Sequence, residues 1–296
     1  MKTIDVLTPS TLAELAAGLR RMTPQSRILA GGTDLMIAMR RGEIRPDRLL
    51  DISGVKDLHR IRQEANQIII GAGATFSEIL ESGLIFQHAC CLAQAAAAIG
   101  SVQIRNRATL AGNIATASPA GDGIPPLYAL AAEVSILNAD GAVRRASVEK
   151  LFAGPYQTTL KCSEAILDLR FALPDPPAVS TFVKLGSRRT VTIARLNLAL
   201  ALCLKPASTT VSTARVALGA AGRTVFRSAA AERLLGRIDL FRPAADDLAD
   251  ILVREIETAI PGRYSLPYKR CAIVGLARQA LDNLSMKCRN VEETCR

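Results

Sequence analysis

Apolar and polar positions follow two different periods along the first half of the chain, and together they predict a mixed α/β unit. Apolar spacing of three to four residues predicts helices, and short apolar runs bounded by glycine, proline or polar residues predict strands. Helix, strand, helix and strand are expected in that order at residues 11–22, 27–30, 35–41 and 48–52. A strand–loop–helix–strand unit therefore surrounds the paired glycines Gly31 and Gly32.

The next stretch predicts further strands, an alanine-rich helix and a long loop. A strand at 67–71 precedes a helix capped near residues 75–77, and 86–99 has the composition of one long helix ending at Gly100. Residues 100–126 show neither the helical nor the strand spacing of apolar residues and are expected as a loop. A loop of this length is usually functional or disordered. Strands are then expected at 133–138, 142–147 and 165–171, the first two forming a hairpin.

A proline-rich segment at 173–177 predicts a linker between two domains. Beyond it, three antiparallel strands are expected at 181–185, 192–204 and 212–219, and three helices at 228–235, 244–259 and 268–284. The expected organisation is a first domain at 1–175 with subdomains of about 1–55 and 56–175, a second domain at 178–285, and a polar, frayed tail at 286–296.

Composition and net charge exclude a few classes of protein but do not identify the function. The chain has 296 residues, 49% of them hydrophobic and 22% charged, as in folded soluble proteins. No apolar run approaches the ~18–20 residues of a membrane span, and the start lacks the apolar core of a secretory signal, so a cytoplasmic location is expected. The net charge of +10 leaves a basic nucleic-acid-binding module open as an alternative, although the basic residues are scattered in pairs.

The cysteines do not predict a metal centre. There are seven, and none are spaced as CxxC or CxxxxC, so neither a zinc site nor a locally built iron–sulfur cluster is expected in this chain. An odd number is typical of reduced thiols. We expect no metal ligands and name no catalytic acid or base.

The segment RILAGGTD at 27–34 carries the first candidate chemistry. Glycines let a ligand approach the backbone closely, and successive free N–H groups beside a helix start form an anion site. Thr33 and Asp34 are expected as helix caps, with a sugar hydroxyl as another partner for Asp34. An ordinary strand–turn–helix junction is the alternative.

The second candidate is QIRNRATLAGNIATASPAGD at 103–122. Its small residues, hydroxyls, amides and terminal carboxylate could bind a ribityl chain and a diphosphate while leaving room for a bulky ring. A surface Ω-loop is the alternative.

Taken together, these segments resemble the FAD-binding subunits of the xanthine, carbon monoxide and nicotinate dehydrogenase family of molybdenum hydroxylases. AGGTDL (30–35), EAILDLRF (164–171), FVKLGSRRT (182–190) and YKR (268–270) extend the resemblance along the chain. It implies the α+β class: a two-subdomain FAD-binding domain of the PCMH type, then a smaller α+β domain with a three-stranded antiparallel sheet and three helices.

The resemblance also implies cofactors and partners. One FAD would be bound noncovalently, with molybdopterin and [2Fe-2S] clusters only on a large and a small partner subunit. Electrons would pass from the clusters through this FAD to NAD or another acceptor. A scaffold subunit that has lost FAD is a further alternative, and the intact Gly31, Gly32, Asn113 and Asp122 argue against it.

By resemblance, Asp122 would bind a ribityl hydroxyl, Ile166 would pack on the isoalloxazine, and Lys184 would lie near that ring, where a cation favours reduced flavin. Ile99, before Gly100, replaces an aromatic residue that some relatives place over the flavin. The diphosphate would be wrapped by Arg27, Ile28, Leu29, Ala30, Gly31, Gly32, Thr33 and Asp34, and the phosphates and ribityl would contact Ala108, Thr109, Gly112 and Asn113.

Two further departures from the family pattern stand out. Ala111 replaces the first glycine of the usual GGN, so the backbone there must tolerate a Cβ atom. After Arg188 and Arg189, residues 190–192 replace the usual Asp, in a loop that controls access to the flavin in relatives. The identity of the electron acceptor therefore stays open.

Overall fold

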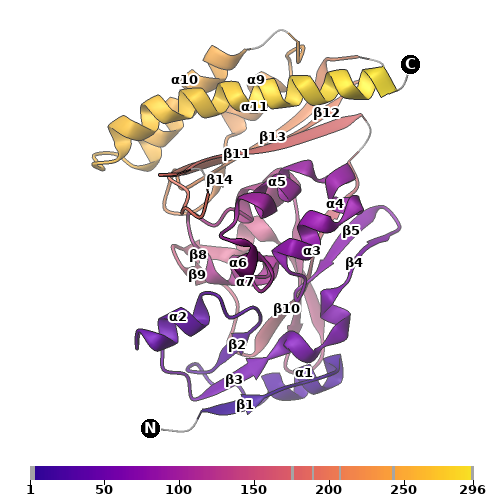
Figure 1. The fold of residues 1–296 in the computed structure, drawn as a ribbon, viewed down its shortest axis with the longest axis vertical. Coiled ribbons are helices and arrows are strands. Elements are labelled where there is room, and N and C mark those ends of the chain that lie inside the picture. The colour runs from indigo at the N-terminus through magenta and orange to yellow at the C-terminus, as the bar shows by residue number, and fades with distance from the viewer. Residues whose placement is uncertain (1–3, 175–176, 189, 207, 242–243, 295–296) are drawn as a thin grey trace.

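The computed structural model describes residues 4–174, 177–188, 190–206, 208–241 and 244–294. Residues 175–176 of the expected linker, Arg189, and the last two residues of the expected tail lie outside these ranges. The part up to residue 174 and the part from residue 177 stack on each other, with the N-terminus at the far end of the first part (Figure 1). The expected α+β class is confirmed.

The first subdomain is a parallel three-stranded sheet with two short helices. Its strand order is β1–β3–β2, and α1 and α2 follow β1 and β2 in the chain. The bounds are β1 Asp5–Leu7, α1 Leu12–Leu19, β2 Arg27–Leu29, α2 Leu35–Arg40 and β3 Arg48–Asp51. The pattern did not predict β1, because three partly exposed residues show no readable alternation.

The second subdomain is built on a five-stranded antiparallel sheet in the order β4–β5–β10–β6–β7. The strands are β4 Ile61–Glu64, β5 Gln67–Gly71, β6 Glu133–Asn138, β7 Val143–Ser147 and β10 Glu164–Ala172. The β6–β7 hairpin is confirmed, with Gly141 at φ +91° in the turn. Short segments η1 Ile52–Gly54, η2 Lys56–His59, η3 Val148–Leu151, β8 Phe152–Gly154 and β9 Gln157–Thr158 connect these elements.

Two predictions for this subdomain, one of a helix and one of a loop, were wrong. The expected helix at 86–99 is two helices, α4 Gly83–His88 and α5 Cys90–Ala98, because the fully buried Ala89 has φ −140° and ψ 51°. The expected loop at 100–126 contains α6 Val102–Arg105, α7 Leu110–Thr116 and α8 Ile124–Ala129. Each of these three helices has seven residues or fewer, which is too short to produce a helical period. The capped helix before them is α3 Phe76–Glu81, with Thr75 and Glu78 forming a capping box.

The C-terminal part has a four-stranded antiparallel sheet rather than the expected three strands. Its order is β11–β12–β13–β14, and β14 is only two residues long. The bounds are β11 Ala178–Leu185, β12 Leu196–Leu204, β13 Val211–Gly219 and β14 Phe226–Arg227. Residues 192–195 lie outside β12, although the pattern had included them in the strand.

Helices cover this sheet on the side away from the first domain (Figure 1). They are α9 Ala229–Leu235, α10 Ala245–Ala259 and α11 Leu266–Thr294. The expectation that the polar tail is frayed is wrong as far as Thr294, because α11 continues to that residue. No helix in the described part of the chain combines the length and apolar character that a membrane span requires.

A small apolar cluster joins the two domains. It consists of Cys91, Ala95, Ala129, Phe182 and Ala199, all buried. Polar contacts surround it: Gln94 Oε1 accepts a hydrogen bond from the Phe182 N–H (2.7 Å), and the Ala220 N–H donates to Pro119 O (2.7 Å). The second domain therefore lies firmly against α5 and the segment that follows α7.

Candidate cofactor-binding site

The two glycine-bearing segments, far apart in sequence, are in direct contact. A Cβ atom on Gly31 would lie 1.9 Å from Arg107 O and 3.0 Å from Ala108 Cα, so only glycine allows this approach. Thr116 Oγ1 also donates a 3.4 Å hydrogen bond to Asp34 Oδ2. In Figure 1 the loop after β2 lies beside α6 and α7.

The turn after β2 presents a run of free backbone donors. Within the described ranges, the N–H groups of Gly31, Gly32, Thr33 and Asp34 have no hydrogen-bond partner. Gly32 has φ +74°, the left-handed conformation that one residue of an anion-binding nest adopts. Asp34 is the N-cap residue of α2, as expected, but its side chain makes no capping hydrogen bond. Four unpaired donors fit an anionic group such as a diphosphate.

The second segment is organised by its own caps. Thr109 Oγ1 accepts a hydrogen bond from the Gly112 N–H (3.0 Å) at the start of α7, and Ala108 O accepts one from the Phe76 N–H (3.0 Å). Asn113 Oδ1 accepts a hydrogen bond from the Gly123 N–H (3.2 Å), which holds the turn before α8 against α7. The backbone around the predicted contact residues is therefore tightly defined.

At the other end of this segment, Asp122 binds two side chains of the C-terminal domain. Lys184 Nζ lies 2.5 Å from Asp122 Oδ2, and Asn197 Nδ2 donates to Asp122 Oδ1 at 2.8 Å. Lys184 Nζ also donates to Ala98 O at 2.9 Å. The side chains of Lys184 and Asp122 are 9% and 8% exposed, and Asn197 is completely buried.

The surroundings of Asp122 contain one feature that disfavours its ionised form and two that favour it. Burial raises the pKa of the Asp122 carboxyl above its ordinary value, while the Lys184 ammonium and the Asn197 amide act in the other direction. The ion pair lies at the contact between the domains and is shielded from water.

The remaining predicted residues divide into core and periphery. Ile166 is buried in the same hydrophobic core as Ala108, and Ile28, Ala30 and Ile99 pack against that core. The Arg27 guanidinium donates to the carbonyl oxygens of Pro24 and Ser26, so it is engaged outside the glycine turn.

Leu29 and Gly100 have local roles around the same segments. The side chain of Leu29 lies where a Cβ atom on Gly32 would be 3.1 Å away. Gly100 has φ +45°, and a Cβ atom there would lie 2.8 Å from the Ile104 side chain.

The loop after β11 carries backbone strain. Val191 has φ +50°, a conformation that β-branched residues rarely adopt, and its carbonyl oxygen accepts two hydrogen bonds from Arg188. A Cβ atom on Gly186 would lie 2.1 Å from the Thr192 side chain. The changed sequence at 190–192 is thus accommodated by a constrained turn.

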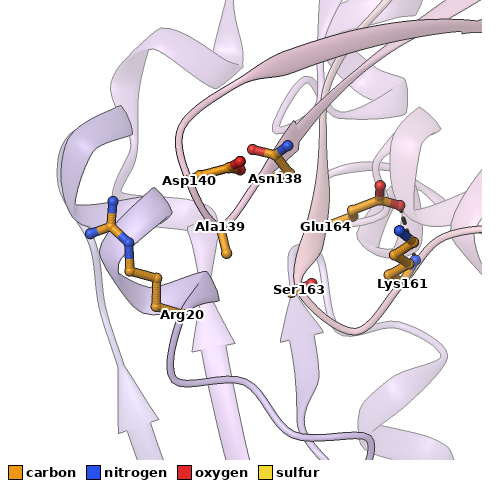
Figure 2. Close-up of a pocket in the computed structure, with 7 residues that line it drawn as sticks. All are labelled: Arg20, Asn138, Ala139, Asp140, Lys161, Ser163 and Glu164. Carbon is orange, nitrogen blue, oxygen red and sulfur yellow. Dashed lines mark hydrogen bonds between the residues drawn. The ribbon is translucent and has the colours of Figure 1, made fainter.

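A separate cavity of about 390 Å³ lies elsewhere on the first domain (Figure 2). It opens between the end of α1, the β6–β7 turn and the segment before β10. Its lining residues are Arg20, Asn138, Ala139, Asp140, Lys161, Ser163 and Glu164. None of the predicted cofactor residues lines it. No cluster of three or more histidine, cysteine or carboxylate side chains within the described ranges could hold a metal ion.

Sequence reasoning missed Asn197 as part of the site. The available signal was a lone amide inside the apolar strand LNLALALCL, at a position that is completely buried. Arg107 was also missed, because it contributes only its carbonyl oxygen against Gly31.

The chain is similar to known proteins along nearly its whole length. Residues 2–175 match the family model for the FAD binding domain in molybdopterin dehydrogenase, and residues 181–284 match that for the CO dehydrogenase flavoprotein C-terminal domain. The nicotinate dehydrogenase FAD-subunit of Eubacterium barkeri is 31% identical over 297 residues, covering 97% of this chain and 99% of that protein.

Similarity to carbon monoxide dehydrogenase appears in both sequence and structure. The medium chain of the Hydrogenophaga pseudoflava enzyme is 28% identical, covering 95% of this chain and 96% of that one. A solved structure of carbon monoxide dehydrogenase from the same organism, in a form that lacks the Mo-pyranopterin moiety, superposes with a TM-score of 0.86 at 26% identity. It covers 96% of this chain and 97% of that chain.

Proposed function

This chain belongs to the family of FAD-binding medium subunits of molybdenum hydroxylases, and we propose that it binds one FAD noncovalently across its two glycine-bearing segments. The free N–H groups of residues 31–34 would hold the diphosphate. Thr109, Gly112 and Asn113 would contact the phosphates and the ribityl chain, and Asp122 would accept a hydrogen bond from a ribityl hydroxyl. The matches cover both domains, which favours this function over a nucleic-acid-binding module.

One observation carries the proposal: Gly31 packs against the Arg107 carbonyl, and the N–H groups of residues 31–34 beside this contact have no partner among the described residues. Without a ligand such donors would depend on water, whereas an anionic cofactor satisfies all of them. The FAD, when bound, supplies the capacity to accept and release electrons. The chain's own task is to orient that group and shield it from water.

We further propose that the side chains near the flavin stabilise the negative charge of its reduced form. Lys184 is a buried cation held by Asp122 and Ala98 O, and a fixed cation stabilises negative charge on a nearby group. Ile99, which is partly buried, and Ile166, which is buried in the core of the first domain, would provide the apolar side of the ring site.

The family membership supports a larger assembly. We propose a small [2Fe-2S] subunit and a large molybdopterin subunit as partners, with electrons arriving from the clusters and leaving to NAD or another acceptor. Expression with the products of the neighbouring reading frames, followed by iron and molybdenum analysis of the purified complex, tests this. A chain that purifies alone under those conditions, without either metal, would refute it.

FAD binding is tested on the full chain by reconstitution and fluorescence titration. The wild-type protein is expected to turn yellow and retain the flavin through gel filtration. Gly31→Ala is expected to abolish retention, because its Cβ atom would collide with Arg107 O. Gly275→Ala is the matched control, since a Cβ atom there meets nothing within 4 Å.

A second variant guards against simple misfolding. Gly32→Ala places a methyl group at φ +74° and disturbs the turn with milder contacts, 3.1 Å to Leu29 and 3.2 Å to Met36. It should weaken FAD binding while the far-UV circular dichroism stays like that of the wild type. A folded, colourless wild-type protein that takes up no FAD would overturn the proposal.

A further inference from the structure

We propose that Asn197 is a positioning residue of the cofactor site, and that through Asp122 it makes the C-terminal domain complete a site begun in the first domain. This inference rests on the proposed FAD-binding function. Neither the resemblance nor the candidate motifs had assigned a role to Asn197.

A single row of residues crosses the C-terminal sheet at this point. Lys184 on β11 is the register partner of Asn197 on β12, and Asn197 is the register partner of Gly219 on β13. Directly paired residues in neighbouring strands present their side chains on the same face of a sheet. The Lys184 and Asn197 side chains both reach the one carboxylate of Asp122, each on a different oxygen.

The orientation of the Asn197 amide follows from its partners. A carboxylate accepts hydrogen bonds only, so the nitrogen of the amide must face Asp122 and the oxygen must face away. Asn197 Oδ1 is buried and has no hydrogen-bond partner among the described residues. It points to Gly219, where a Cβ atom would lie only 2.1 Å from it.

A completely buried amide with an unsatisfied oxygen is unfavourable for stability by itself. An apolar side chain of similar size would suit this apolar strand better. The presence of an amide at this position therefore argues for a role at Asp122, where its N–H group is used. Such exceptions to good packing are expected near functional sites.

The role that the contacts support is to fix a carboxylate. With Asn197 in place, one oxygen of Asp122 is held by the amide and the other by Lys184, the one charged side chain among the described residues that pairs with this carboxylate. Without the amide, Asp122 can rotate about its remaining partner, and the position of the Lys184 ammonium becomes less defined. Both groups belong to the proposed FAD site, so cofactor affinity should report the change.

The pH dependence gives a signature that a purely structural role would not produce. Burial already raises the pKa of Asp122, and loss of the amide donor raises it further. In the variant, Asp122 should therefore become protonated at a higher pH than in the wild type. The acid-side loss of FAD affinity should shift to higher pH accordingly.

Two variants of the full chain test the proposal from opposite sides. Asn197→Leu removes the donor with little change in volume. Gly219→Ala retains Asn197 but forces its amide to turn, because the new methyl group would meet Oδ1, with Pro125 Cγ next at 2.9 Å. Asn283→Leu is the matched control: the Asn283 side chain donates to Thr181 Oγ1 (3.3 Å) and, among the described residues, makes no hydrogen bond to Asp122.

We expect Asn197→Leu and Gly219→Ala to weaken FAD binding by roughly tenfold or more, by analogy with the loss of affinity when residues that orient metal ligands are removed. Both should shift the pH profile of FAD affinity and the flavin midpoint potential, while Asn283→Leu changes none of these. If Asn197→Leu fails to fold, Gly219→Ala decides. Folded variants with wild-type affinity, pH profile and potential would overturn the role of Asn197 alone, whereas a wild-type chain that binds no FAD would overturn the proposed function with it.

Discussion

Removing one partner of the buried Lys184–Asp122 pair should be far more costly than removing one partner of an exposed pair of similar length. Asp122→Leu leaves the Lys184 ammonium buried, with Ala98 O as its one remaining partner among the described residues. Breaking a buried ion pair in this way costs about 3–5 kcal/mol of unfolding free energy, because the remaining charge is uncompensated. The exposed pair Arg278–Asp246 has an N···O distance of 2.8 Å, yet Asp246→Ala should have little effect, since water solvates both groups.

Urea denaturation of the FAD-free protein, followed by far-UV circular dichroism, measures both losses without a contribution from cofactor binding. The double variant Asp122→Leu/Lys184→Met should recover most of the stability lost in the single variant, because replacing a whole buried pair by apolar residues is often neutral. Strict additivity of the two single changes would refute this reasoning. So would an Asp122→Leu variant that is no less stable than Asp246→Ala.

Three further predictions concern other parts of the fold. The Arg144 guanidinium holds the pKa of Glu164 below its ordinary value, so the stabilisation from this pair is full above that ordinary pKa and is lost as pH falls through the lowered one. Glu164→Gln should therefore flatten the decline in melting temperature below roughly pH 4.5. Val191→Asn should raise stability by about 1 kcal/mol in a thermal melt, because asparagine tolerates the positive φ better than valine. Gln94→Ala should lower the urea midpoint by an amount equivalent to about 1–3 kcal/mol, because it leaves the buried Phe182 N–H without its acceptor.

Much of the fold follows from pattern because most strands are long enough to show it. The hairpin of β6 and β7, the strand β10 and the three long strands of the C-terminal sheet were all expected within a few residues. Several of the missed elements share a physical cause: β1 and β4 are short and partly exposed, and α6, α7 and α8 have less than two full turns each. At these lengths tertiary contacts and caps, rather than periodicity, decide the conformation.

Some residues of the candidate site could be predicted from the sequence, and others could not. Gly31 and Gly32 were identifiable because a close backbone approach and a positive φ both require glycine. Asn197 was not, because its role depends on a strand register that places it between Lys184 and Gly219. Which residues a buried amide meets across a sheet follows from pairing, and pairing is a property of the whole fold.

The local backbone and the available space explain why Ala111 can replace a glycine while Gly31 cannot be replaced. Ala111 lies inside α7, where its Cβ atom is buried without a positive φ, so the backbone keeps the conformation that any residue adopts. Gly31 lies where the added carbon would occupy the position of the Arg107 carbonyl. The end of the site that presents backbone donors therefore depends on the absence of a side chain at one position. The Asp122 end depends instead on the presence of two side chains from the other domain. Variants at the two ends should therefore lose FAD binding for different reasons. At Gly31 the added carbon collides with the Arg107 carbonyl, whereas at Asn197 the charged groups of Asp122 and Lys184 are no longer held in position.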